Sequence, residues 1–131
     1  MKILAVYVAT LVVFLGVDFI WLGRMGDAFY RPAMGDMALT DFRLAPAIVF
    51  YLLYAFGVVF FAVNPALASG DWKTALLNGF LLGLVGYGVY DLTNQATLKS
   101  WPVALTLVDM TWGAFLTGIA ALGGYGAGRL V

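Results

Sequence analysis

The chain has 131 residues, of which 63% are hydrophobic and 11% are charged, and its formal net charge is zero. This composition is far more apolar than that of a soluble domain, and it excludes a basic surface for nucleic acid. Cysteine and histidine are both absent, which excludes disulfides, haem ligation by histidine and the usual zinc and iron–sulfur sites. We therefore expect no metal, no cofactor and a protein whose main partner is the lipid bilayer.

Four apolar runs are long enough to cross a bilayer. A membrane-spanning helix needs about 20 apolar residues, and such runs occupy residues 3–22, 44–63, 74–98 and 102–126. The first run is too long for the hydrophobic region of a signal peptide and lacks a small-residue cleavage site. We predict an all-α fold, an integral membrane four-helix bundle that forms a single transmembrane domain over residues 1–131.

A polar linker separates the first two predicted helices. Residues 23–43 mix charged side chains with aromatic and methionine side chains, which is typical of a segment that lies on the membrane surface. We expect this linker to be interfacial. The second helix begins with Pro46 in its first turn, where a missing N–H is harmless, and is expected to stop at Asn64-Pro65.

Small residues repeat along the third predicted helix. Gly79, Gly83 and Gly86 are spaced i, i+4, i+7 and therefore share one helix face. Small residues let membrane helices approach closely, because lipid supplies no hydrophobic force between them. We predict that this face packs against another helix.

Three aspartates interrupt the apolar runs at comparable depth. Successive spans alternate in direction, so the first and third helices end at the membrane face where the second and fourth begin. At 1.5 Å rise per residue, Asp18, Asp91 and Asp109 each lie roughly 6 to 12 Å below that face. A carboxylate in hydrocarbon costs about 2.5 to 3.5 kcal/mol. We therefore expect the three acids to face the interior and form a polar site.

Two of the aspartates belong to a repeated pattern, Val-Asp-x-x-Trp, at residues 17–21 and 108–112. The i, i+3 spacing places the aspartate and the tryptophan on one helix face. The candidate ligand-binding residues are Asp18, Trp21, Tyr51, Tyr90, Asp91, Thr93, Asn94, Gln95, Asp109 and Trp112. The candidate rim residues are Arg24, Arg31, Arg43 and Lys99.

Structural roles for these residues stay open. The acids can pair with the basic rim side chains, or accept hydrogen bonds from Tyr51, Thr93 and Asn94, simply to lock the bundle. Tryptophan is enriched at membrane interfaces because its ring is amphipathic. Trp21 and Trp112 can therefore serve as anchors rather than stack on a ligand.

Three segments carry a family resemblance. They read Asp-Phe-Ile-Trp-Leu-Gly at 18–23, Tyr-Asp-Leu-Thr-Asn-Gln-Ala-Thr-Leu-Lys-Ser-Trp-Pro at 90–102 and Val-Asp-Met-Thr-Trp-Gly at 108–113. On these residues the chain resembles, over essentially its whole length, the bacterial membrane-protein family known as domain of unknown function 2177 (DUF2177). The resemblance implies a multi-pass protein of the bacterial inner membrane and supplies no activity.

Three functions remain open from the sequence. Acids at one depth favour a site that binds or passes a small polar or cationic species, with a homodimer needed if four helices enclose too little volume. A membrane-embedded lipid-modifying enzyme is less favoured, because no nucleophile or metal motif is recognisable. The third is an accessory subunit of a larger membrane complex, or a protein that binds an amphipathic ligand through its aromatic side chains.

Overall fold

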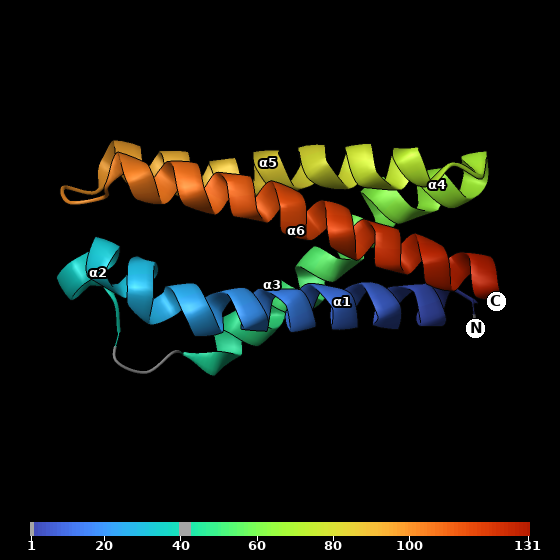
Figure 1. Ribbon diagram of the computed structural model, residues 1–131, viewed down its shortest axis with the longest axis horizontal. Helices are drawn as coiled ribbons and strands as arrows, with labels where there is room; N and C mark the ends of the chain where they lie inside the picture. Colours follow the sequence, from blue (N-terminus) through green and yellow to red (C-terminus); the bar gives the residue numbers. More distant parts are fainter. Residues whose placement is uncertain (1, 40–42) are drawn as a thin grey trace.

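Four long helices make up the computed structural model, which describes residues 2–39 and 43–131. They are α1 (Lys2–Met25), α3 (Leu44–Val58), α5 (Trp72–Thr97) and α6 (Val103–Leu130). Helices α5 and α6 run side by side, α1 packs along α6, and α3 begins beside α1 (Figure 1). The described residues contain no strand, and the four helices, with their continuations, are long and apolar enough to cross a membrane. The predicted all-α membrane bundle is confirmed.

Helix α1 continues into the polar linker instead of ending where the charges begin. Beyond the predicted end at Leu22, helical structure runs through η1 (Gly26–Tyr30), α2 (Arg31–Met34) and η2 (Gly35–Met37). A helix satisfies its own backbone hydrogen bonds, so it can extend into the interface past the first charged residue. No side chain of η1, α2 or η2 is buried, as expected for an interfacial segment. Residues 40–42 of the predicted linker lie outside the described residues.

The second span also continues past its predicted end at Asn64-Pro65. Helix α3 passes into η3 (Val59–Val63), a π-helical turn, and then into α4 (Asn64–Ser69). Proline has no N–H to donate, and a wider turn before it accommodates the missing bond without breaking the helix. The span ends at Gly70, whose φ of 71° lies in the left-handed region that glycine adopts readily.

Glycines bring α5 and α6 into close contact. A Cβ atom on Gly83 would overlap the backbone oxygen of Gly113, and one on Gly79 would lie 2.9 Å from the α6 backbone. The predicted packing face is therefore confirmed at these two positions. Gly86 instead faces Tyr54, whose ring lies 3.4 Å from the place a Cβ would occupy. At Gly86 the small residue makes room for a ring rather than for a helix.

The main apolar cluster lies near the end of the bundle that holds both termini (Figure 1). Buried residues such as Val6, Val63, Ala75 and Ala121 pack together there. Toward the opposite end, where α2 and the α5–α6 connection lie, the interior side chains become aromatic and acidic. The cavities described next open in this half of the molecule.

Candidate functional site

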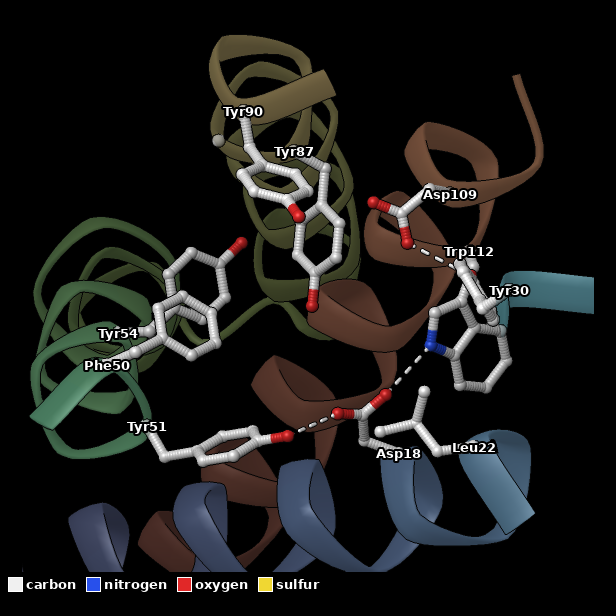
Figure 2. A pocket seen from close by; sticks show the side chains of 11 residues that line it. Asp18, Leu22, Tyr30, Phe50, Tyr51, Tyr54, Tyr87, Tyr90, Asp109 and Trp112 are labelled. Atoms are coloured by element: carbon white, nitrogen blue, oxygen red, sulfur yellow. Dashed lines mark hydrogen bonds between the residues drawn. The ribbon is translucent and has the colours of Figure 1, made fainter. Parts of the chain in front are cut away.

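A cavity of about 420 Å³ opens between the four spans and is walled by side chains from each of them (Figure 2). We call it the inner cavity. Its lining residues are Asp18, Leu22, Tyr30, Phe50, Tyr51, Tyr54, Gly86, Tyr87, Tyr90, Asp109 and Trp112. Seven of these eleven residues are aromatic, two are aspartates and none is basic. The cavity therefore combines apolar walls with acidic groups.

Asp18 of α1 is nearly buried, at 6% exposure, and both of its oxygens accept hydrogen bonds. The Tyr51 hydroxyl donates to Oδ2 at 2.8 Å, and Nε1 of Trp112 donates to Oδ1 at 3.1 Å. An indole N–H can only donate, so this arrangement uses both carboxyl oxygens as acceptors. Neutral donors from α3 and α6 thus fix the orientation of Asp18 at the cavity wall.

Asp109 of α6 is held from the helical continuation of α1. The Tyr30 hydroxyl donates to Oδ1 of Asp109 at 2.9 Å and accepts a hydrogen bond from Nε1 of Trp21 at 3.0 Å. Asp109 also interacts electrostatically with Asp18. A chain of hydrogen bonds therefore joins the end of α1 to the start of α6.

The two copies of the Val-Asp-x-x-Trp pattern meet across the α1–α6 interface. Trp21 and Trp112 stack with ring centroids 4.2 Å apart and an interplanar angle of 7°. Each aspartate is served by the tryptophan of the other copy, directly for Asp18 and through Tyr30 for Asp109. The tryptophans therefore do more than anchor the helices at an interface, and Trp112 also lines the inner cavity.

A second cavity of about 590 Å³, the outer cavity, lies between the inner cavity and residues 26–39, which we call the α2 segment. The two cavities adjoin, because Leu22, Tyr30, Tyr90 and Asp109 line both. The outer cavity differs in charge from the inner cavity, because Arg31 and Arg43 line it. The α2 segment thus forms the outer wall of a space that leads to the inner cavity.

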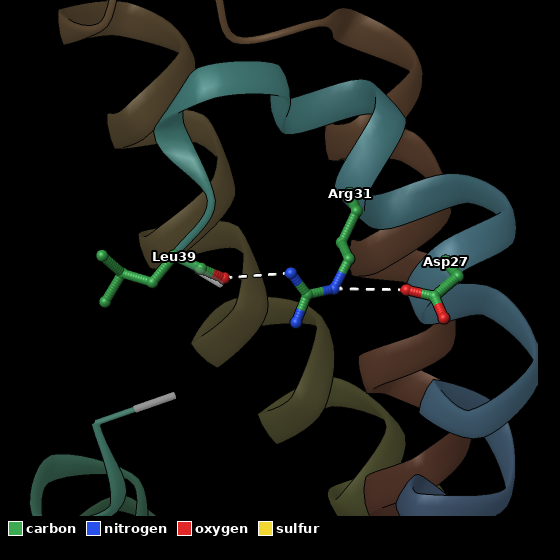
Figure 3. A network of polar contacts seen from close by, with 3 residues as sticks. All are labelled: Asp27, Arg31 and Leu39. Carbon is green, nitrogen blue, oxygen red and sulfur yellow. Dashed lines mark hydrogen bonds and ion pairs between the residues drawn. The ribbon is translucent and has the colours of Figure 1, made fainter. Parts of the chain in front are cut away.

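Arg31, one of these arginines, makes polar contacts within the α2 segment (Figure 3). Nε of Arg31 lies 3.3 Å from Oδ1 of Asp27, and Nη1 of Arg31 donates to the backbone oxygen of Leu39 at 3.0 Å. The ion pair spans i, i+4 on neighbouring helical turns. Arg31 therefore ties both ends of the segment together beside the outer cavity.

Asp91 of α5 is fully buried, at 0% exposure. Neither of its carboxyl oxygens has a hydrogen-bond partner among the described residues. The residue lines the outer cavity and interacts electrostatically with Asp109. A buried polar group without a partner is costly. Asp91 is thus a buried acid beside the outer cavity, with no hydrogen-bond donor for either oxygen among the described residues.

The structure brings some of the predicted site residues together and separates others. The predicted residues that line the inner cavity are Asp18, Tyr51, Tyr90, Asp109 and Trp112. Asp91, Arg31 and Arg43 line the outer cavity.

Other predicted residues line neither cavity. They are Trp21, Thr93, Asn94, Gln95, Arg24 and Lys99. The Thr93 hydroxyl donates to the backbone oxygens of Val89 and Tyr90, so it serves its own helix. Trp21 does not line the inner cavity, but its ring stacks on that of Trp112, which does.

Three tyrosines of the inner cavity were not among the predicted site residues. They are Tyr30, Tyr54 and Tyr87. A usable signal existed for two of them, because Tyr54 follows Tyr51 by three residues and Tyr87 precedes Tyr90 by three. This spacing places each pair on one helix face.

Comparison with known proteins identifies a family for this chain. A family model described as a predicted membrane protein (DUF2177) matches residues 3–126. No curated protein and no solved structure matches the chain. The family match covers all four spans and the residues of both cavities. The chain therefore belongs to the DUF2177 family of predicted membrane proteins.

Proposed function

We propose that the protein binds a small organic cation in the inner cavity. The observation that carries this proposal is the lining of the cavity, seven aromatic side chains and two aspartates without a basic residue. A cation over an aromatic face is attracted by the ring quadrupole, by about 0.5 to 2 kcal/mol per contact and most strongly where water is excluded. The aspartates add charge attraction, which low dielectric strengthens.

The size and walls of the cavity favour an organic ammonium group over a bare metal ion. A volume of about 420 Å³ lies within the range of about 300 to 1,000 Å³ typical of small-molecule sites. Hard metal ions prefer a cage of oxygen ligands, whereas the rings of Phe50 and Tyr54 lie opposite Asp18 and Asp109 (Figure 2). A trimethylammonium group would present its methyl groups to the rings and its charge to the carboxylates.

The hydrogen bonds of the two aspartates support the same ligand class. Tyr51, Trp112 and Tyr30 are neutral donors, so they orient the carboxylates without cancelling their charge. A cation that enters the cavity would supply the compensating charge. An anion would be repelled by both aspartates.

The positions of the acids support binding at one membrane face rather than a path through the bilayer. Asp18, Asp91 and Asp109 all lie in the third of their helices that is nearest α2. We also propose that the protein resides in the bacterial inner membrane, on the basis of its family resemblance. Fractionation of bacterial membranes checks this location, and recovery outside the inner-membrane fraction would contradict it.

The ligand class can be tested with two molecules of nearly equal shape. Choline carries a trimethylammonium group, and 3,3-dimethyl-1-butanol replaces the charged nitrogen by carbon. We expect choline to bind the purified protein in lipid nanodiscs at least tenfold more tightly, because tenfold corresponds to about 1.4 kcal/mol and cation–π contacts plus charge exceed this. Isothermal titration calorimetry measures both affinities. Equal affinities, or no binding of choline, would contradict the proposal.

Matched variants assign the binding to the inner cavity. The double variant Asp18→Asn/Asp109→Asn keeps the side-chain shapes and removes both charges, and we expect it to weaken choline binding at least tenfold. Asp71→Asn is the control, because Asp71 caps α5 at the other end of the bundle and asparagine caps helices equally well. Circular dichroism and gel filtration check that each variant is folded. A double variant that is folded and binds choline normally would place the site elsewhere.

A further inference from the structure

An apolar groove on the outside of the bundle adjoins the inner cavity. This groove, which we call the α3–α5 groove, has a volume of about 410 Å³ and is walled by residues such as Leu53, Gly57, Phe60 and Leu82. Phe50 and Tyr54 line both the groove and the inner cavity. Their rings stack with centroids 5.3 Å apart and an interplanar angle of 27°. The two spaces therefore adjoin at one stacked pair of rings.

The path of the second span creates the groove. Helix α3 packs beside α1 and contacts α5 through the ring of Tyr54, whereas the following turn η3 packs closely against α5. The two helices thus diverge at the level of the inner cavity. Gly57 carries no side chain into the space between α3 and α5, and a Cβ there would meet no atom within 4 Å. The groove is therefore open at this position.

The groove offers no polar contact to a ligand. Among the described residues that line it, the only polar side-chain group is the Tyr54 hydroxyl. This hydroxyl is hydrogen-bonded to Oγ1 of Thr117 at 2.8 Å. The side chains of Leu53 and Phe60 are 68% and 58% exposed on the outer surface. In a membrane these residues face lipid. The groove therefore matches a hydrocarbon chain and not a polar molecule.

We infer that the ligand is a cationic amphiphile taken from the bilayer, with its ammonium group in the inner cavity and its hydrocarbon tail in the α3–α5 groove. This inference rests on the proposed function for the ammonium group and adds the tail. The tail would pass Phe50 and Tyr54 and remain in an apolar environment throughout. The head would leave the membrane surface only for a cavity that supplies aromatic faces and carboxylates.

A hydrocarbon tail fits this continuity better than a second copy of the chain. An α-helix with its side chains is about 10 to 12 Å across, so it could cover the groove but could not follow it past Phe50 into the inner cavity. An alkyl chain is only one methylene wide. A ligand that occupies both spaces must therefore be thin where it passes Phe50 and Tyr54.

Because the chain contains no cysteine, single substitutions can carry a fluorescent label at one chosen place. Leu53→Cys places a bimane at the edge of the groove. Val12→Cys is the control, since Val12 is 61% exposed on α1 at a similar depth and lines none of the cavities described. The probe is dodecyltrimethylammonium with a nitroxide on its tail. It is added to single proteins in nanodiscs of phosphatidylethanolamine and phosphatidylglycerol, whose head groups carry no trimethylammonium.

We expect saturable quenching of the Leu53 label, at least fivefold stronger than quenching of the Val12 label at low probe content. Excess tetramethylammonium should reverse it, because this ion occupies the inner cavity without a tail. Gly57→Leu fills the groove, and in that background we expect the saturable quenching to disappear while choline affinity stays within twofold of the parent.

Three outcomes would overturn the inference. The first is equal, unsaturable quenching at both labels with choline still bound, which would leave the proposed function standing without a tail site. The second is quenching that survives Gly57→Leu. The third is a Leu53 label shielded only when two proteins share a nanodisc, which would assign the groove to a second copy. Failure of both choline and tetramethylammonium to bind would instead contradict the proposed function itself.

Discussion

Tyr30 is a single residue on which two others depend. Its hydroxyl accepts from Trp21 and donates to Asp109, a double role that only a group with both a proton and lone pairs can fill. Tyr30 also lines both the inner and the outer cavity. The residue therefore couples the position of the α2 segment to the orientation of an acidic group in the site.

Tyr30→Phe keeps the ring and removes the hydroxyl. We expect it to lower the free energy of unfolding by about 1 to 3 kcal/mol, because the N–H of Trp21 and an oxygen of Asp109 lose their partner in a partly buried place. Unfolding by sodium dodecyl sulfate in mixed micelles measures the change.

Tyr90→Phe is the matched control, since no hydrogen bond of the Tyr90 hydroxyl is found among the described residues. Its ring packs edge-on to Trp101 with centroids 5.6 Å apart, a contact that phenylalanine keeps. Equal stabilities of the two variants would show that the Tyr30 hydrogen bonds contribute nothing to the fold.

The acids of the site were easier to predict from the sequence than its aromatic residues. Asp18, Asp91 and Asp109 stand out because a charge within an apolar run is costly. Tyr54 and Tyr87 do not stand out by residue type, since 16% of the chain is aromatic and a ring occurs equally in the core, at the interface or at a site. Only their three-residue spacing from Tyr51 and Tyr90 marks them. Tyr30 escaped prediction because its place depends on α1 continuing into the linker.

At the scale of helices, the α5–α6 pair is the most closely packed unit. Gly79 and Gly83 of α5 lie against the backbone of α6, and α6 carries the largest set of buried residues of the four spans. Close backbone approach is the main source of association between helices in lipid. This pair therefore provides the fixed support on which Asp91, Asp109 and Trp112 are positioned.

Gly83→Ala would insert a methyl group against the backbone oxygen of Gly113. Overpacking of this kind costs about 1 to 3 kcal/mol, and we expect a loss of stability in that range. Gly16→Ala on α1 is the control, because a Cβ there meets nothing within 4 Å and alanine favours helix over glycine by about 1 kcal/mol. Unfolding in mixed micelles compares the two. A Gly83→Ala protein as stable as the Gly16→Ala protein would show that the interface can relax.

Helix positions were more predictable than helix ends. The length of an apolar run indicates a span directly, but a charged or proline residue is a weak stop signal in a membrane protein. Helix α1 passes Arg24, and the second span passes Pro65 by means of the π-helical turn η3. In both cases the intrahelical hydrogen bonds are worth more in a bilayer than the local preference to end.

At the scale of the whole molecule, four spans place η2 and the α5–α6 connection at one end, and the α4–α5 connection at the other (Figure 1). Single cysteines test this arrangement. We expect Asp36→Cys and Ser100→Cys to react with a membrane-impermeant maleimide from one side of sealed vesicles, and Ser69→Cys from the other. All three positions are exposed, so detergent-opened vesicles should label each of them fully. Labelling of Ser69→Cys from the same side as Ser100→Cys would refute a four-span topology.

Asp18, near the start of the chain, is hydrogen-bonded by Trp112, near its end, and this has a consequence for biosynthesis. Asp18 and Trp112 are 94 positions apart, so the first helix enters the membrane long before the indole that bonds its carboxylate has been translated. Tyr51 can reach Asp18 once the second span is inserted, whereas Trp112 and Asp109 arrive only with the last. Until then Tyr30 and one oxygen of Asp18 lack their final partners. A ribosome that stops early thus releases a chain in which Asp18 lacks one of its two hydrogen-bond donors.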